Sequence, residues 1–225
     1  KVGDAQSLDD IYCRHILAGR LPELIPDTAS EPLAMSLPIT TAVPIGKHAS
    51  VPIRLQDGTV HGMFCCLGFE PDPTLHERDL RMMRVFAELT GIEISRDLAA
   101  RNLAREKAAR VRAAIDNDEM SMAFQPIRHL KEGRVVGFEC LARFSGAPLR
   151  APDKWFAEAG EVGLGTTLEV AAIRLALSAL PAFPADVYLA VNVSPDTVLT
   201  DELAAVMRGQ PADRLVLEIT EHAHV

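Results

Sequence analysis

The chain has 225 residues, of which 48% are hydrophobic and 24% charged; these globular proportions exclude a disordered or fibrous protein. Its formal net charge of −8 and its pI of about 5.4 argue against a protein that binds DNA or an anionic membrane. The sequence has no apolar run near the roughly 18 residues of a membrane span and no signal-peptide pattern, so we expect a cytoplasmic protein.

The first third of the chain contains a helical pattern and a hairpin pattern. Apolar residues over 8–17 are spaced as in a helix. Strand-like runs over 50–55 and 60–68 flank Asp57-Gly58. Because Asp-Gly between two apolar runs is typical of a tight turn, these runs predict a β-hairpin.

The four cysteines predict neither a disulfide framework nor a metal site, because no CxxC spacing is present. Cys65 and Cys66 lie in a strand-like run and are expected to point to opposite faces. Cys13, two residues before His15, could suggest haem or bilin binding, but a buried structural cysteine is the simpler interpretation. This cysteine usage fits a reducing compartment.

The middle of the chain is predicted to be helical. Residues 76–87 have helical spacing, and after Gly91 the pattern becomes polar and alanine-rich, which predicts a linker helix over 93–115. Its basic residues are expected to form a solvated face; they are Arg96, Arg101, Arg105, Lys107, Arg110 and Arg112. Its narrow apolar stripe consists of Leu98, Ala104, Ala108, Val111 and Ile115. The helix is therefore either a solvated linker or a signalling helix that pairs with its copy, and we expect a homodimer.

From about residue 116, strand and helix patterns alternate. Strands are expected at 120–127, 134–141, 187–193 and 215–219. Helices are expected at 153–159, 167–180 and 200–207. This alternation predicts βαβ units and a parallel sheet.

Three of these strands run into an oxygen-bearing side chain, namely Glu139, Asn192 and Glu218. In a β/α barrel the carboxyl ends of the strands share one face, where active sites lie. Carboxylate and amide oxygens suit Mg²⁺ or Mn²⁺, although polar residues also end strands for structural reasons alone. Gln125, which is expected to end the first strand, and Arg143 would suit an anionic substrate.

At these residues the sequence resembles the EAL family of cyclic di-GMP phosphodiesterases. The matching motifs are Phe124-Gln125-Pro126-Ile127, Glu139-Cys140-Leu141-Ala142-Arg143, Trp155-Phe156-Ala157-Glu158, Asn192-Val193-Ser194-Pro195 and Glu218-Ile219-Thr220-Glu221. They follow the family's order over about 114–225, with Cys140 where the signature has Ala.

The resemblance implies a β/α barrel that hydrolyses cyclic di-GMP, a bacterial second messenger, to linear pGpG with two divalent ions, Mg²⁺ or Mn²⁺. By this resemblance the metal ligands are Glu139, Asn192 and Glu218. The residues that contact the dinucleotide are Gln125, Leu141 and Arg143. Catalysis involves Glu139, Glu218 and Glu221, and the last of these holds a mobile loop over the site.

The first part of the chain resembles a GAF sensor domain. The matching segments are 8–13, 21–27, 51–58 and 77–80. The first helix and strand of such a domain are missing, so we expect its N-terminus to be incomplete. Because the sequence has no asparagine–lysine signature of cyclic-nucleotide binding, it does not identify the ligand of the GAF domain.

We therefore predict an α+β GAF-like domain over 1–92, a signalling helix over 93–115, and over 116–225 the N-terminal half of an α/β EAL-type barrel. In this interpretation the GAF domain, with an unknown small-molecule or protein signal, regulates the phosphodiesterase. The alternatives are an inactive EAL receptor for cyclic di-GMP and a scaffold dimerised by the GAF domain. A β/α barrel needs about 250 residues, and the segment from 114 to 225 supplies 112 of them. We therefore expect the 225-residue stretch to be inactive alone and part of a longer protein.

Overall fold

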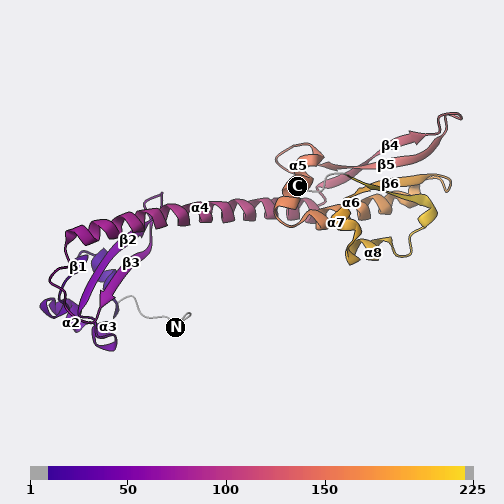
Figure 1. Ribbon diagram of the computed structural model, residues 1–225. Coiled ribbons are helices and arrows are strands. Elements are labelled where there is room, and N and C mark those ends of the chain that lie inside the picture. The colour runs from indigo at the N-terminus through magenta and orange to yellow at the C-terminus, as the bar shows by residue number, and fades with distance from the viewer. Residues whose placement is uncertain (1–9, 221–225) are drawn as a thin grey trace. The chain divides into compact units, whose positions relative to one another are not determined.

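The structure is a computed structural model that describes residues 10–220 (Figure 1). The chain divides into two units, Lys1–Ala100 and Arg101–Val225. Each unit has its own β-sheet and its own core. None of the helices in the described part of the chain has both the length and the apolar character that a membrane span requires.

The first unit contains a three-stranded antiparallel sheet in the order β1-β2-β3. Its strands are β1 (Leu24–Ile25), β2 (Lys47–Arg54) and β3 (Val60–Gly68). Its short helices are α1 (Tyr12–Leu17), α2 (Pro32–Ser36) and α3 (Pro38–Ala42). The predicted hairpin is confirmed, and Gly58 takes the positive φ of 84° that its turn requires. The predicted helix over 8–17 is present from Tyr12, and residues 8 and 9 lie outside the described range.

Both faces of this sheet are covered. On one face, Ala49 and Val51 of β2 pack against Leu80, Met83 and Ala87 of α4 (Glu77–Asp116), which lies along β2 and β3 in Figure 1. On the other face, α1 and the segments that follow it form a second cluster. Its members include Tyr12, Ile16, Ile25 and Ile45.

α4 is one continuous helix of 40 residues, so the helical pattern over 76–87 and the predicted linker helix over 93–115 belong to one element. Gly91 lies within this helix and has a packing role. A Cβ at Gly91 would collide with the carbonyl oxygen of Arg54 at the end of β2. One turn further on, the Ser95 hydroxyl accepts a hydrogen bond from the Gln56 backbone N–H at 3.0 Å. Gly91 therefore lets the hairpin approach the helix closely.

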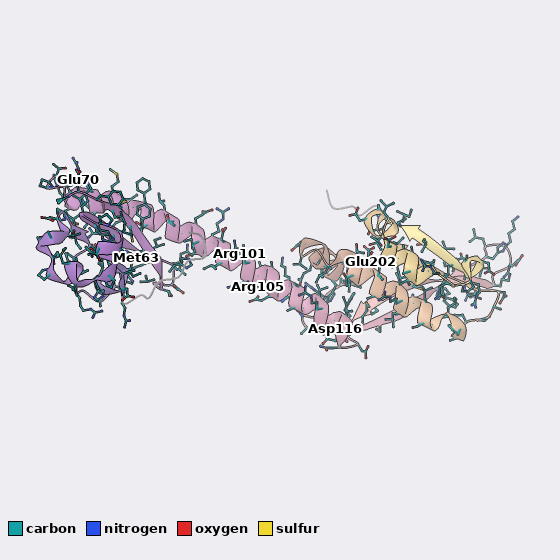
Figure 2. All side chains as sticks on the ribbon, turned by 90° about the horizontal axis from the view of Figure 1, so that it is seen from below. Met63, Glu70, Arg101, Arg105, Asp116 and Glu202 are labelled. Carbon is teal, nitrogen blue, oxygen red and sulfur yellow. The ribbon has the colours of Figure 1, made fainter. Side chains whose placement is uncertain are left out.

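The basic face predicted for the C-terminal part of α4 is solvated only in part, because Lys107 and Arg110 pair with Glu161 and Glu158. Arg101 and Arg105 are exposed, and their side chains extend away from the helix in Figure 2. The apolar stripe differs from the expectation, because Val111 is fully buried within the second unit against the cluster that contains Trp155. This end of the stripe needs no second copy of the chain to cover it.

The second unit contains a four-stranded sheet in the order β4-β5-β6-β7. Its strands are β4 (Met120–Arg128), β5 (Val135–Phe144), β6 (Tyr188–Val193) and β7 (Leu215–Ile219). Its helices after α4 are α5 (Pro152–Glu161), α6 (Gly165–Ala179), α7 (Pro195–Val198) and α8 (Asp201–Met207). All seven elements predicted in this region from the sequence are present, with ends shifted by a few residues.

The prediction of an all-parallel sheet is wrong at its first pair of strands. β4 and β5 are antiparallel, whereas β5, β6 and β7 are parallel to one another. The connection over 129–134 is a turn in which Gly133 has a φ of 69°. Such a connection is too short for the crossover that a parallel pair requires.

The core of this unit lies between the sheet and its helices. Leu189, Val191 and Val193 of β6 pack with Ile173 and Leu177 of α6. A second cluster surrounds Trp155, which is fully buried and stacks on Phe144 with ring centroids 5.0 Å apart. The helices therefore cover one face of the sheet, and the opposite face carries the polar side chains.

Candidate functional site

The polar residues singled out from the sequence lie on one face of the second sheet. Gln125 of β4 is directly opposite Glu139 of β5, and Asn192 of β6 is directly opposite Glu218 of β7. Glu139 is opposite Ala190, two residues before Asn192. Because side chains alternate between faces along a strand, Gln125, Glu139, Asn192 and Glu218 project from the same face.

Their positions along the strands differ from the sequence prediction. Glu139 and Gln125 lie within β5 and β4, not at their ends. The hairpin is the cause, because β4 continues to pair with β5 up to Phe144. The parallel pairing of β5 with β6 covers only Gly137–Cys140. Within the parallel ladders, Glu139, Asn192 and Glu218 are therefore each second from the carboxyl end.

One hydrogen bond joins two of these side chains. The Asn192 amide nitrogen donates to Glu139 Oε1 at 3.2 Å. The bond orients the amide and leaves its carbonyl oxygen available as a ligand. Glu139 and Asn192 are half-buried, while Gln125 and Glu218 are exposed. The face is thus open to solvent at both sides of this central pair.

The segment after Asn192 is held by a capping network that the sequence analysis missed. Glu169 of α6 accepts hydrogen bonds from the Ser194 backbone N–H at 2.9 Å and from its hydroxyl at 2.8 Å. Ser194 in turn caps α7 by accepting from the Thr197 N–H at 3.3 Å. The signal was present in the sequence, since Ser194-Pro195 is a typical helix start. This network fixes the end of β6, which carries Asn192.

Leu141 and Arg143 occupy the same face as Glu139, two and four residues further along β5. Arg143 is exposed, and its Nη1 donates to the Ala142 carbonyl at 2.9 Å. Both residues, together with Asn192, line a cavity of about 280 Å³. Its other walls include Phe156, Ile173 and Val191, so the cavity lies on the side of the sheet that α5 and α6 cover, behind the polar face.

Cys140, the departure from the EAL signature, points away from the polar face. It belongs to the buried cluster beneath α6. Burial raises the pKa of the Cys140 thiol to about 11, and the nearby charge of Glu139 adds to the rise. The residue therefore stays a neutral core thiol and does not disturb the side chain of Glu139.

The donors on this face fit a hard divalent cation in kind, since they are carboxylate and amide oxygens. Within residues 10–220, no group of three or more His, Cys, Asp or Glu side chains is arranged to hold a metal ion. The two carboxylates that the described residues supply are Glu139 and Glu218. Glu221, the third carboxylate expected from the sequence, lies outside the described residues.

The profile of the EAL domain matches residues 108–225, and that of the GAF domain matches residues 2–94. The EAL match covers more than half of the chain. The chain belongs to the EAL domain family. It carries a GAF domain followed by a partial EAL domain, as the sequence resemblance predicted.

Three similar proteins illustrate these matches. An uncharacterized protein, y4lL, of Sinorhizobium fredii is 36% identical over 134 residues, which are 56% of this chain and 16% of that protein. The FimX EAL domain of Xanthomonas citri, solved with c-diGMP, is 19% identical with a TM-score of 0.45, covering 55% of this chain and 52% of that one. The Bacillus subtilis YkuI protein, solved with substrate c-di-GMP and calcium, is 25% identical with a TM-score of 0.40, covering 50% of this chain and 30% of that one. The chain thus spans about one sixth of the curated relative and about half or less of these solved chains.

Proposed function

We propose that this is a signalling protein in which the GAF domain regulates an EAL domain that hydrolyses cyclic di-GMP to linear pGpG. Membership of the EAL family supports the substrate and the reaction. The observation that carries the proposal is the alignment of Gln125, Glu139, Asn192 and Glu218 on one open face of the sheet. A sheet face that only had to be solvated would not need this row of ligand-type oxygens on neighbouring strands.

In this proposal Glu139, Asn192 and Glu218 hold Mg²⁺ or Mn²⁺. Such ions, when bound, polarise the phosphodiester and lower the pKa of a water molecule. The hydrogen bond from Asn192 holds the Glu139 carboxylate in place. Water and phosphate oxygens would complete the coordination, because these three side chains are too few for a hard cation.

Arg143, Gln125 and Leu141 bind the dinucleotide in this proposal. Arg143 uses one guanidinium nitrogen on the backbone, which leaves further N–H donors for a phosphate or a guanine edge. Glu221, which lies outside the described residues, holds a mobile loop over the site in this proposal. The last described hydrogen bond toward it runs from the Thr220 N–H to the Val193 carbonyl at 3.1 Å.

We further propose that the four-stranded sheet is the first half of the β/α barrel of a complete EAL domain, with the polar face toward the barrel interior. The proposed boundaries remain 1–92 for the GAF-like domain, 93–115 for the signalling part of α4, and 116–225 for the EAL part. The parallel order of β5, β6 and β7 and the helices on one face support this arrangement.

The proposal includes a homodimer. Its contact surface is now the N-terminal half of α4 and not the apolar stripe expected over 93–115. Met82, Val85, Leu89 and Ile92 of α4 are between 45% and 60% exposed. Their spacing of three, four and three residues forms one apolar row, as in a coiled-coil seam. Light scattering of Leu89→Glu should show a monomer where the unchanged chain is a dimer; a monomer in both would refute the homodimer.

Glu139→Ala in the intact protein tests the enzyme assignment. We expect hydrolysis of cyclic di-GMP to fall by at least about 100-fold, because a metal ligand is lost, while circular dichroism stays unchanged. Glu132→Ala is the matched control, since Glu132 lies in the turn of the same hairpin and pairs with Arg134. Equal activity of both variants would overturn the role of Glu139. Tight binding of cyclic di-GMP by the unchanged protein without hydrolysis would favour the receptor alternative.

A further inference from the structure

Two cysteines that are far apart in the sequence lie side by side in the first unit. Cys13 Sγ on α1 is 3.8 Å from Cys65 Sγ on β3, and both are free thiols. Cys65 is exposed and Cys13 is partly buried. Their separation of 52 positions in the chain explains why the sequence predicted no pair. Cys13 is only partly buried and lies beside a second thiol, so the expectation of a buried cysteine is not met.

The surroundings of Cys65 are polar on the side that faces the protein. Ser50, directly opposite Cys65 in the hairpin, is fully buried and places its hydroxyl 3.0 Å from Cys65 Sγ. His48 lies on the same face of β2, is 4% exposed, and contacts the edge of the Tyr12 ring. Its Nδ1 is buried and has no hydrogen-bond partner among the described residues.

These contacts divide the two thiols into different roles. The hydrogen bond between Cys13 and Cys65 lowers the pKa of Cys65, against the opposing effect of burial, and the contacts with His48 and Ser50 lower it further. The same contact and burial raise the pKa of Cys13. A thiolate is the nucleophilic form of cysteine. Cys65 is thus the more exposed sulfur and the one whose thiolate its neighbours favour, and Cys13 is the adjacent, partly buried thiol.

We propose that Cys13 and Cys65 form a thiol-oxidation site whose oxidant is a hydroperoxide. The site lies in the GAF unit and is independent of the proposed hydrolysis at the EAL face. Its ligand chemistry is that of a small polar oxidant, because the reacting sulfur is open to solvent. Cys66 does not take part, since it is opposite Ala49 and lies on the other face of β3.

The reaction balances in two steps. The Cys65 thiolate attacks the O–O bond of the hydroperoxide, gives a sulfenic acid, and releases water or an alcohol after one proton is taken up. The Cys13 sulfur then attacks the sulfenic sulfur, which forms the S–S bond and releases water. Both thiols together lose two electrons, and the O–O bond accepts them. The product covalently links α1 to β3.

The test treats the 225-residue chain with a small molar excess of hydrogen peroxide and then maps its peptides without reduction. We expect a Cys13–Cys65 linkage, an intact mass lower by two hydrogen atoms, and the loss of two titratable thiols. Cys66→Ser is the matched control, because it removes the neighbouring exposed cysteine, and it should form the same linkage at an unchanged rate. A thiol reductant such as dithiothreitol should reduce the linkage and restore the starting mass.

Two variants separate the roles. In Cys13→Ser, oxidation should stop at the sulfenic acid of Cys65, which a dimedone-type reagent traps. In Cys65→Ser, the reaction of Cys13 with peroxide should be at least about tenfold slower than that of Cys65 in the unchanged chain, because Cys13 is partly buried and burial disfavours its thiolate. An intermolecular linkage through Cys66, oxidation of Cys13 alone, or no linkage in the unchanged chain would each overturn the proposal. Because the peptide map of the unchanged chain decides the matter, a variant that fails to fold leaves the test intact.

Discussion

The two sheets of the molecule use their faces differently. In the GAF unit both faces are covered, and the polar residues of β2, His48 and Ser50, are buried. In the EAL unit one face is packed by helices, while the other carries Gln125 and Glu218 in the open. The difference shows that polar residues in a strand can have either of two roles. On a covered face they tune a neighbouring group, and on an open face they are available to a ligand.

The largest effect is expected from Trp155→Ala, which tests whether the two units have separate cores. Trp155 is fully buried and packs only with residues of the second unit. Its removal should cost about 3–5 kcal/mol of unfolding free energy. Hydrogen exchange should show faster opening of β5 and α5, with β2 and β3 unchanged. Equal acceleration in both sheets would mean that the units unfold together.

A somewhat smaller effect is expected from Glu158→Gln in the same core. Glu158 is buried and pairs with Arg150 at 2.5 Å and with Arg110 at 2.9 Å. Removing one charged partner of a buried ion pair costs about 3 kcal/mol of unfolding free energy. Chemical denaturation should show this loss in the second unit alone, and Glu132→Gln in the exposed turn is the control.

The same residue predicts a pH dependence. Burial raises the pKa of Glu158, but the hydrogen bonds from Arg150 and Arg110 outweigh burial and bring the pKa below its usual range. A carboxylate with a lowered folded-state pKa stabilises the fold above its unfolded pKa of about 4.3, and this contribution is lost as the pH falls through the folded value. The difference in melting temperature between the unchanged chain and Glu158→Gln should therefore shrink as the pH is lowered from neutral to acidic. A difference in melting temperature that does not change with pH would contradict the lowered pKa of Glu158.

Gly91→Ala tests the packing of the GAF unit on α4. A side chain there must displace the Arg54 carbonyl, so we expect a loss of about 1–3 kcal/mol despite the better helix propensity of alanine. Gly62→Ala is the control, because a Cβ at Gly62 meets nothing within 4 Å. Its stability should stay within about 1 kcal/mol of the unchanged chain. A stabilising Gly91→Ala would mean that the hairpin does not dock on the helix.

Local patterns predicted the elements of the fold, and contacts between distant segments decided the rest. The sequence placed Asn192 and Glu218 at the carboxyl ends of two strands, and the strand register sets them directly opposite each other. The antiparallel pairing of β4 and β5 was missed although Gly133 marked a turn between two strand patterns. The packing of Gly91 against the Arg54 carbonyl was not predicted, because the two residues are distant in the sequence.

The candidate site follows the same division. Its residue types and their positions near the carboxyl ends of strands could be predicted from the sequences of single strands, whereas their common sheet face depends on the register between strands. The hydrogen bond between Asn192 and Glu139 and the cap from Glu169 to Ser194 depend on the register between strands and on the position of α6. Neither register nor helix position is encoded in a short motif, so these contacts needed the structure.

The most direct test of the central claim is a hydrogen-exchange footprint of cyclic di-GMP with Mn²⁺ on the intact protein. The open face of the EAL sheet should be the binding surface, so protection should appear in peptides that cover Glu139–Arg143 and Tyr188–Val193. Peptides from β2 and β3 of the GAF unit should exchange at unchanged rates. Protection confined to β2 and β3, or no protection on the EAL sheet at saturating dinucleotide, would contradict the account.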